Sequence, residues 1–215
     1  MTQRLRLITC VLAISICSVL TGGCATDLTR QTVQSTQSTT YSSASTSPRQ
    51  HDSFGNPLPF VTKFFNRWNP GNNGTQYEPC TALAAAEISD LGLDPNSVKD
   101  VAIVDGQTAR GCTWNAKKPI GEALYLNQKV GNSESLESYK AKYQYLGKWR
   151  PDVFIRGRQV GIEEDGFGGC TTYVQSGEAG VITNTTSSGR MEQTLDEQCN
   201  WVFAFTEATI DQIPK

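Results

Sequence analysis

Hydrophobic and polar residues divide the 215-residue chain into stretches of different character. An apolar run covers residues 7–20, and a stretch dominated by Ser, Thr and Gln follows over residues 25–50. Mixed aromatic and polar residues over 57–77 lead into residues 78–215, where apolar side chains recur with the periods of helices and strands. The pattern therefore predicts one folded domain behind a long N-terminal extension.

Helical spacing occurs three times in residues 78–215. Thr81 is a candidate N-cap for the first helix, and Gly92 is placed to stop it. A capping-box sequence, Thr194-x-x-Glu197, opens the last helix. We therefore expect helices over Cys80–Ile88 and Ser135–Leu146, and a final helix that begins at Thr194 and ends before Pro214.

Short runs with strand character, separated by turn residues, fill the remainder of the domain. They are Cys112–Asn115, Ala123–Asn127, Val153–Ile155, Val160–Glu163, Cys170–Val174 and Gly180–Asn184. The first two are joined by a turn around Lys117-Lys118-Pro119. The predicted fold class is α+β, an antiparallel sheet packed with about three helices and stabilised by two disulfides.

Residues 57–77 form a pre-domain segment with an apolar stripe at helical spacing. The stripe consists of Phe60, Val61, Phe64, Phe65 and Trp68, with Lys63, Asn66 and Arg67 opposite. We predict a short amphipathic helix over residues 60–68. It could contact lipid or a partner through Phe64, Phe65 and Trp68, or pack on its own domain, and the second use is favoured.

The N-terminus has the pattern of an export signal. Arg4 and Arg6 precede the apolar run, whose 14 residues are too few for the roughly 20 that a membrane-spanning helix needs. Leu20-Thr21-Gly22-Gly23-Cys24 then resembles a lipobox. We predict a signal peptide over residues 1–23, lipid attached to the thiol of Cys24, and a disordered tether over 24–56. The alternative is an ordinary cleaved signal near which Cys24 merely lies.

Four cysteines remain after the signal and the lipid site are set aside. They are Cys80, Cys112, Cys170 and Cys199, separated by 32, 58 and 29 positions. An even number in an exported chain favours two disulfides, and three pairings are possible. Sequential pairing is favoured because it ties a helix to the sheet twice. The wide spacing argues against a metal site.

Charge and histidine content narrow the function classes. Removal of residues 1–23 leaves 17 basic and 21 acidic side chains, a net charge of −4, which argues against nucleic acid as a partner. The single histidine, His51, lies in the expected tether. Catalysis that requires a positioned histidine base is therefore not expected. We expect no cofactor and no enzymatic activity.

Carboxylates are densest at Glu163-Glu164-Asp165, before the turn Gly166-Phe167-Gly168-Gly169. Paired carboxylates can perform acid–base chemistry or bind calcium. Neighbouring strand residues point to opposite faces, however, so Glu163 and Glu164 would not converge. A solvated strand end is the favoured interpretation.

Among the aromatic residues, Trp149 beside Arg150-Pro151 is the least typical of a core and is a candidate ligand or partner contact.

Two motifs then connect the chain to a family. Glu78-Pro79-Cys80-Thr81-Ala82-Leu83 and Arg110-Gly111-Cys112-Thr113-Trp114, with later cysteines at 170 and 199, resemble actinobacterial envelope lipoproteins that carry the domain of unknown function 3558. The resemblance covers roughly residues 78–213. It implies an envelope lipoprotein with two disulfides and an α+β fold, and it supplies no catalytic residues.

The leading hypothesis is a lipid-anchored binding or accessory module on the outer face of the cytoplasmic membrane. It would contact the membrane through Cys24, and its ligand would be a lipid, a glycan or an envelope protein. The alternatives are a structural spacer without a small ligand and a hydrolase that uses Glu163, Glu164 and Asp165.

Overall fold

The computed structural model describes residues 47–117, 123–166, 168–189 and 193–215, which form one compact unit. The expected signal peptide, Cys24 and most of the expected tether lie outside the described residues. Phe167 and part of the expected turn around Lys117-Lys118-Pro119 also lie outside them.

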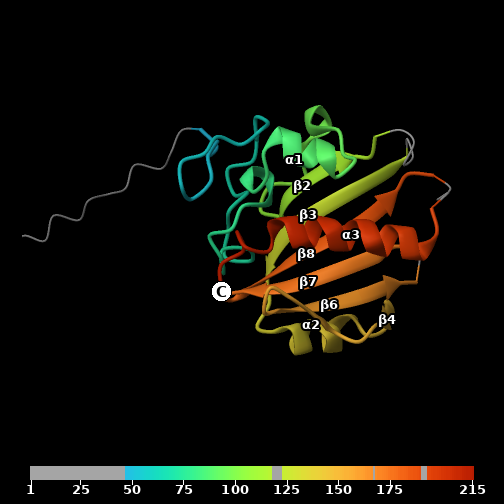
Figure 1. The fold of residues 1–215 in the computed structure, drawn as a ribbon. Coiled ribbons are helices and arrows are strands. Elements are labelled where there is room, and N and C mark those ends of the chain that lie inside the picture. The colour runs from blue at the N-terminus through green and yellow to red at the C-terminus, as the bar shows by residue number, and fades with distance from the viewer. Residues whose placement is uncertain (1–46, 118–122, 167, 190–192) are drawn as a thin grey trace, which may run out of the picture. The chain divides into compact units, whose positions relative to one another are not determined.

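An eight-stranded antiparallel sheet dominates the described part of the chain (Figure 1). Its strands are β1 (Lys99–Asp100), β2 (Arg110–Asn115), β3 (Leu124–Asn132), β4 (Gly147–Trp149), β5 (Val153–Ile155), β6 (Arg158–Asp165), β7 (Cys170–Ser176) and β8 (Ala179–Ser187). They follow the order β1-β2-β3-β8-β7-β6-β4, and β5 pairs with β6 beside this path. The predicted antiparallel sheet is confirmed, and it is larger than the sequence pattern indicated.

Three α-helices accompany the sheet: α1 (Ala85–Asp90), α2 (Leu136–Tyr143) and α3 (Leu195–Thr209). Two single turns of 3-10 helix, Pro79–Thr81 and Pro95–Ser97, complete the helical structure of the described residues. The capping box at Thr194 is confirmed, since its hydroxyl accepts a hydrogen bond from the Glu197 amide while the Glu197 carboxylate accepts one from the Thr194 amide. Gly92 stops α1 with φ +77°, as predicted.

The first predicted helix is shorter than expected. Residues 79–81 form the 3-10 turn, and α1 begins only after Ala84 as N-cap. Thr81 therefore does not cap α1, and its hydroxyl donates instead to the Asp52 carboxylate at 2.7 Å. The Thr81 side chain joins the domain to the segment before it, a use that local sequence does not reveal.

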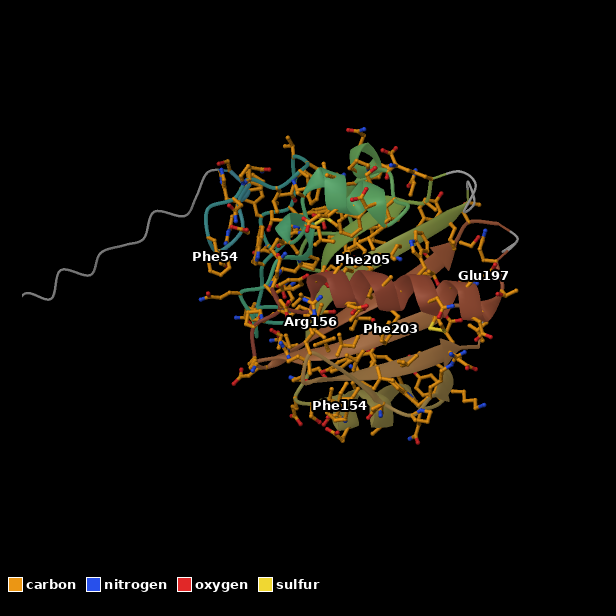
Figure 2. All side chains as sticks on the ribbon, viewed as in Figure 1. Phe54, Phe154, Arg156, Glu197, Phe203 and Phe205 are labelled. Atoms are coloured by element: carbon orange, nitrogen blue, oxygen red, sulfur yellow. A yellow bond between two sulfur atoms is a disulfide. The ribbon has the colours of Figure 1, made fainter. Side chains whose placement is uncertain are left out.

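The hydrophobic core lies between α3 and one face of the sheet (Figure 1). Because side chains alternate along a strand, every second residue of the central strands points toward α3. Phe205 on α3 packs with Trp114 and Leu126, and Val202 packs beside Cys170 and Cys199. Figure 2 shows Phe205 and Phe203 on α3, with side chains between this helix and the strands. The amphipathic final helix is thus the main cover of this face.

Both disulfides have the sequential pairing. Cys80 of the 3-10 turn bonds to Cys112 on β2, and Cys170 on β7 bonds to Cys199 on α3. Each therefore fastens a helical segment to the sheet, as expected from the sequence.

The segment over residues 60–68 is irregular, so the predicted amphipathic helix is wrong. Phe60 and Trp68 pack against the core cluster of Trp114 and Phe205, whereas Val61 and Phe65 are exposed. Residues 47–56, placed by the sequence in the tether, already pack on the domain, since Asp52 is only 5% exposed. The folded part thus begins before residue 57.

Candidate functional site

The described residues form a groove of about 510 Å³ between residues 60–64 and 98–103. The groove lies at the β1 edge of the sheet. There residues 60–64 face residues 98–103, the stretch that contains β1. Its apolar lining comes from both walls and consists of Phe60, Val61, Phe64, Val98, Ala102 and Ile103. Thr62, Lys63, Lys99 and Asp100 complete it.

Hydrogen bonds hold the two walls of the groove together. The Thr62 hydroxyl donates to Asp100 Oδ2 at 3.5 Å. Asn66 donates through its backbone amide to Asp105 Oδ1 at 2.7 Å and through Nδ2 to Asp105 Oδ2 at 2.9 Å. Because both ends of the contact are fixed, the groove is preformed rather than assembled on binding.

A buried ionic cluster lies behind the groove and anchors one wall to the domain. Arg67 Nε donates to Asp100 Oδ2 at 2.8 Å, and its terminal nitrogens donate to both oxygens of Glu78 at 2.7 and 3.0 Å. Arg110 also donates to Glu78 at 3.1 Å. Burial opposes the charged guanidinium, but hydrogen bonds and negative charges of Glu78 and Asp100 raise the pKa of Arg67. The pairing satisfies charges that would otherwise be costly to bury.

Several apolar side chains at the groove are open to solvent. Val61 is 89% exposed and Ile103 83%, and both line the groove. Phe65 and Val104, next to lining residues in the chain, are each 57% exposed. Clustered exposed apolar side chains around a concavity are typical of binding sites. The exposed lysines Lys63 and Lys99 add positive charge at the same place.

The predicted contact residues fall in different places. Phe64 lines the groove and Phe65 lies beside it. Trp68 packs against the core, and its ring lies under the guanidinium groups of Arg49 and Arg67 at 4.3 and 4.5 Å. Trp149 is on β4, at the opposite edge of the sheet from β1. The structure therefore brings Phe64 and Phe65 together and separates them from Trp149.

The carboxylate cluster is divided between environments. Glu164 pairs with Arg150 at 2.5 Å, and Asp165 accepts a hydrogen bond from the Gly169 amide at 2.7 Å. Glu163 is only 5% exposed, so the expectation of a solvated strand end is wrong for this residue. Burial, followed by the charge of Asp165, raises the pKa of Glu163.

The described residues contain no group of three or more His, Cys, Asp or Glu side chains arranged to hold a metal ion. No helix in the same residues has the length and apolarity to cross a bilayer. His51 lies in an isolated bridge with Pro57.

Sequence reasoning missed one wall of the groove and the ionic cluster behind it. The signal for the wall was the apolar run Val101–Val104 ending at the turn residues Asp105-Gly106. Glu78, Arg67 and Arg110 carry no local mark of burial in the sequence, although the fold buries all three. Their charges identify a cluster only once the fold is known.

Comparison with known proteins gives one match. No curated protein and no solved structure matches the chain. A family model described as a protein of unknown function, DUF3558, matches residues 19–212. This match covers nearly the whole chain and confirms the domain of unknown function that the two cysteine motifs suggested. The chain belongs to the DUF3558 family.

Proposed function

We propose that this protein is a lipid-anchored lipoprotein whose folded domain binds the apolar chain of a lipid in the groove between residues 60–64 and 98–103. The observation that carries the proposal is an apolar concavity of about 510 Å³ whose lining includes the exposed side chains of Val61 and Ile103. Its volume falls within the range of small-molecule sites, roughly 300–1,000 Å³.

The lining favours an apolar chain over a polar ligand. Six of the ten lining residues are hydrophobic, and they come from both walls, so a hydrocarbon chain would contact apolar side chains on either side. Burial of Val61 and Ile103 against such a chain would contribute roughly 1.5–3 kcal/mol for each fully covered side chain. Asp100, the lining carboxylate, is already engaged by Arg67, Thr62 and the Ala102 amide.

The charge at the groove favours a lipid with a negatively charged headgroup. Lys63 and Lys99 both line the groove and both are exposed, so their ammonium groups are accessible to a ligand. Ammonium groups interact favourably with phosphate or carboxylate oxygens. An acidic headgroup at the lysines with its chain between the walls satisfies both features of the site.

The N-terminal pattern supports attachment to a membrane. Arg4, Arg6, the apolar run and Cys24 form the signal described above, and the Ser/Thr/Gln-rich stretch separates Cys24 from the first described residue, 47. A flexible chain of this length has a mean span of about 25 Å. A domain attached through Cys24 would therefore remain close enough to a bilayer to exchange lipid with it.

We propose binding rather than catalysis. The support is that Glu164 is engaged by Arg150 and Asp165 by the Gly169 amide, because a carboxylate hydrolase needs two available groups that face one substrate. A lipid-binding module needs no such pair.

The test is titration of the full chain with a fluorescent fatty acid, cis-parinaric acid, for the wild type and for Val61→Asp and Ile103→Asp. Each variant places a charge in the apolar lining, so binding should weaken by about tenfold or more. Lys63→Glu should weaken binding of the carboxylate probe while leaving binding of the uncharged methyl ester nearly unchanged.

Phe154→Asp is the matched control, since Phe154 is 73% exposed on β5, away from the groove (Figure 2). Equal loss of binding in Phe154→Asp and Val61→Asp would show that the probe recognises exposed apolar surface in general. That result, or wild-type affinity in both groove variants, would contradict the proposal.

A further inference from the structure

A patch of four exposed apolar side chains lies at the rim of the lipid groove. This rim patch consists of Val61, Phe65, Ile103 and Val104, and each of its members is more than half exposed. A lipid chain in the groove would cover Val61 and Ile103, but Phe65 and Val104 do not line the groove. The proposed function therefore leaves part of this apolar surface without a partner.

The two segments that carry the rim patch are bonded to each other, so the patch is continuous. The groove has one patch residue on each of its walls. Asn66, which follows Phe65, donates from its amide and from Nδ2 to the carboxylate of Asp105, which follows Val104. These two hydrogen bonds place Phe65 and Val104 on adjoining parts of the two segments.

Hydrogen bonds on the inner side of both segments hold the rim patch toward solvent. Thr62 is buried, its amide donates to Gln50 Oε1 at 3.0 Å, and its carbonyl accepts from Gln50 Nε2 at 2.9 Å. The neighbouring Val61 could turn inward only if these bonds broke. On the other wall, the Ile103 amide donates to Gln107 Oε1 at 3.1 Å. The fold thus maintains an exposed apolar cluster, and such clusters mark interaction surfaces.

Positive charge lies within the rim patch. Lys63 is between the two patch residues of the first segment, Lys99 is on the opposite wall of the groove, and both are exposed. Neither lysine belongs to an ion pair of the described residues. The nearby carboxylates are engaged, because Asp100 is bonded to Arg67 and both oxygens of Asp105 accept hydrogen bonds. Apolar side chains interleaved with unpaired lysines suit the surface of an anionic bilayer.

The start of the described chain lies against the same wall of the groove. Gln50, close to the first described residue, 47, bonds to Thr62, which lines the groove. The polar stretch before residue 47 therefore joins the domain beside the rim patch. Attachment at Cys24, as proposed above, would keep the patch within the span of the tether from the bilayer and raise the local concentration of lipid around it.

We propose that the rim patch docks the domain on an anionic bilayer. Its apolar side chains lie among the acyl chains, and Lys63 and Lys99 lie at the lipid phosphates. The lipid groove then opens at the membrane surface, so that a lipid chain enters between the two walls without crossing water. This inference rests on the proposed function for the use of docking, but docking can be measured whether or not the groove holds a lipid.

The test asks whether lipid chains reach a tryptophan introduced into the rim patch. The full chain with Phe65→Trp is reconstituted into vesicles of equal parts phosphatidylcholine and phosphatidylglycerol, with or without bromine on the acyl chains. Bromine quenches tryptophan on contact, and subtraction of the wild-type signal isolates the added residue. Its fluorescence should be quenched in these vesicles, and quenched less in phosphatidylcholine alone.

Phe154→Trp is the matched control. Phe154 is also more than half exposed, but it lies on β5, which pairs with β6 far from the β1 edge (Figure 2). The tryptophan introduced there should show little quenching by brominated lipid, because the docked domain holds β5 away from the bilayer.

Two further variants, made in the Phe65→Trp chain, separate docking from the binding of lipid in the groove. Val104→Asp should shift the docking equilibrium by about tenfold toward the undocked state, because a charge replaces an apolar contact. Since Val104 does not line the groove, the affinity of this variant for cis-parinaric acid should not change. Lys99→Glu should weaken docking by about fivefold or more, because it reverses a charge at the anionic surface.

The proposal is overturned if Phe65→Trp and Phe154→Trp are quenched equally, if neither is quenched, or if Val104→Asp leaves the quenching unchanged. The first two results would assign the patch to a protein partner or to no partner. Quenching of Phe65→Trp alone, together with no binding of cis-parinaric acid, would support docking and refute lipid binding in the groove. Thermal unfolding of every variant confirms that it is folded before its docking is interpreted.

Discussion

At the scale of single residues, Asp52 shows how one carboxylate can organise the segment before the groove. Its oxygens accept hydrogen bonds from the Phe54 and Asn56 amides at 2.8 and 2.9 Å, from Asn56 Nδ2 at 2.8 Å, and from the Thr81 hydroxyl at 2.7 Å. Burial acts to raise the pKa of Asp52, but these hydrogen bonds outweigh it and lower the pKa below its ordinary value. The ionised form therefore stabilises the folded loop.

Because folding lowers the pKa of Asp52, the free energy of unfolding depends on pH, and the direction of that dependence is known. The stabilisation by Asp52 is fully present above the pKa of an unfolded aspartate, about 4, and is lost as the pH falls through the lower folded-state pKa. At neutral pH, Asp52→Asn should reduce the free energy of unfolding by about 1–2 kcal/mol, through lost acceptor oxygens. Urea unfolding between pH 2 and 7 (roughly the range that spans both pKa values) measures the difference.

The exposed Asp90 supplies the control, Asp90→Asn. The difference in the free energy of unfolding between the wild type and Asp52→Asn should become smaller as the solution becomes acidic. The Asp90 variant should have the same pH dependence as the wild type. A difference in the free energy of unfolding that stays constant with pH would mean that the charge of the Asp52 carboxylate does not stabilise the loop.

Residue-level patterns identified the cysteine pairing and the Thr194 cap but not the cluster of Arg67, Glu78 and Arg110. A cap is a contact between residues three apart, so the sequence displays it directly. The buried ions join positions 11 and 32 residues apart through loops of irregular conformation. Spacing in the sequence carries no information about such contacts.

At the scale of elements, β2 and β3 approach each other closely at Gly111. This residue has φ +153°, and a Cβ atom there would lie 2.1 Å from the Gln128 carbonyl oxygen and 2.7 Å from Lys129 Cα. Both contacts are with the backbone of β3, which cannot move without opening the strand pairing. The motif Arg110-Gly111-Cys112 therefore requires glycine at its centre because of the neighbouring strand.

Gly111→Ala should lower the midpoint of urea unfolding, with a loss of about 1–3 kcal/mol or more, because an added methyl group in a filled space forces the strands apart. Gly189→Ala is the comparison, since a Cβ there would meet only the Ala123 Cβ at 3.7 Å. Circular dichroism during urea titration measures both. Equal urea midpoints for the two variants would show that β3 accommodates the added methyl group without a loss of stability.

Six of the eight strands, all except β1 and β4, and the last two helices were predictable because their apolar periods reflect burial on one face. The same reasoning failed at residues 60–68, where the spacing suited a helix. There Thr62 and Arg67 are buried and bound to Asp100, while the apolar Val61 faces solvent. Long-range hydrogen bonds determine this segment, so its local pattern was misleading, and the groove that it forms with residues 98–103 could not be foreseen.

At the scale of the whole molecule, the lipid groove and the N-terminal signal belong to one proposed arrangement. The groove lies at the β1 edge of the sheet. A protein attached to a membrane could then hold a lipid at this edge. The arrangement depends on attachment, which Cys24 is proposed to provide.

Cys24→Ser should release the exported protein from the membrane fraction into the soluble fraction, because lipid chains contribute about 0.8 kcal/mol per buried methylene and serine cannot be alkylated in this way. Cell fractionation with immunoblotting measures the distribution, and mass spectrometry of the mature N-terminus identifies the attached lipid. Cys10→Ser, within the signal, should leave the distribution unchanged. An unmodified Cys24 in the membrane fraction would refute the anchor.

The arrangement of the two disulfides has a further consequence. One bridge lies wholly before residue 113 and the other wholly after residue 169, and neither crosses the pairing of β3 with β8. A single backbone cut in the connection from β3 to β4 would therefore produce two unlinked polypeptides, each retaining its own bridge. Their reassociation would rest on the nine residue pairs from Leu124–Ser187 to Asn132–Ala179 and on the packing of α3, which makes this connection the natural point for dividing the domain into complementary fragments.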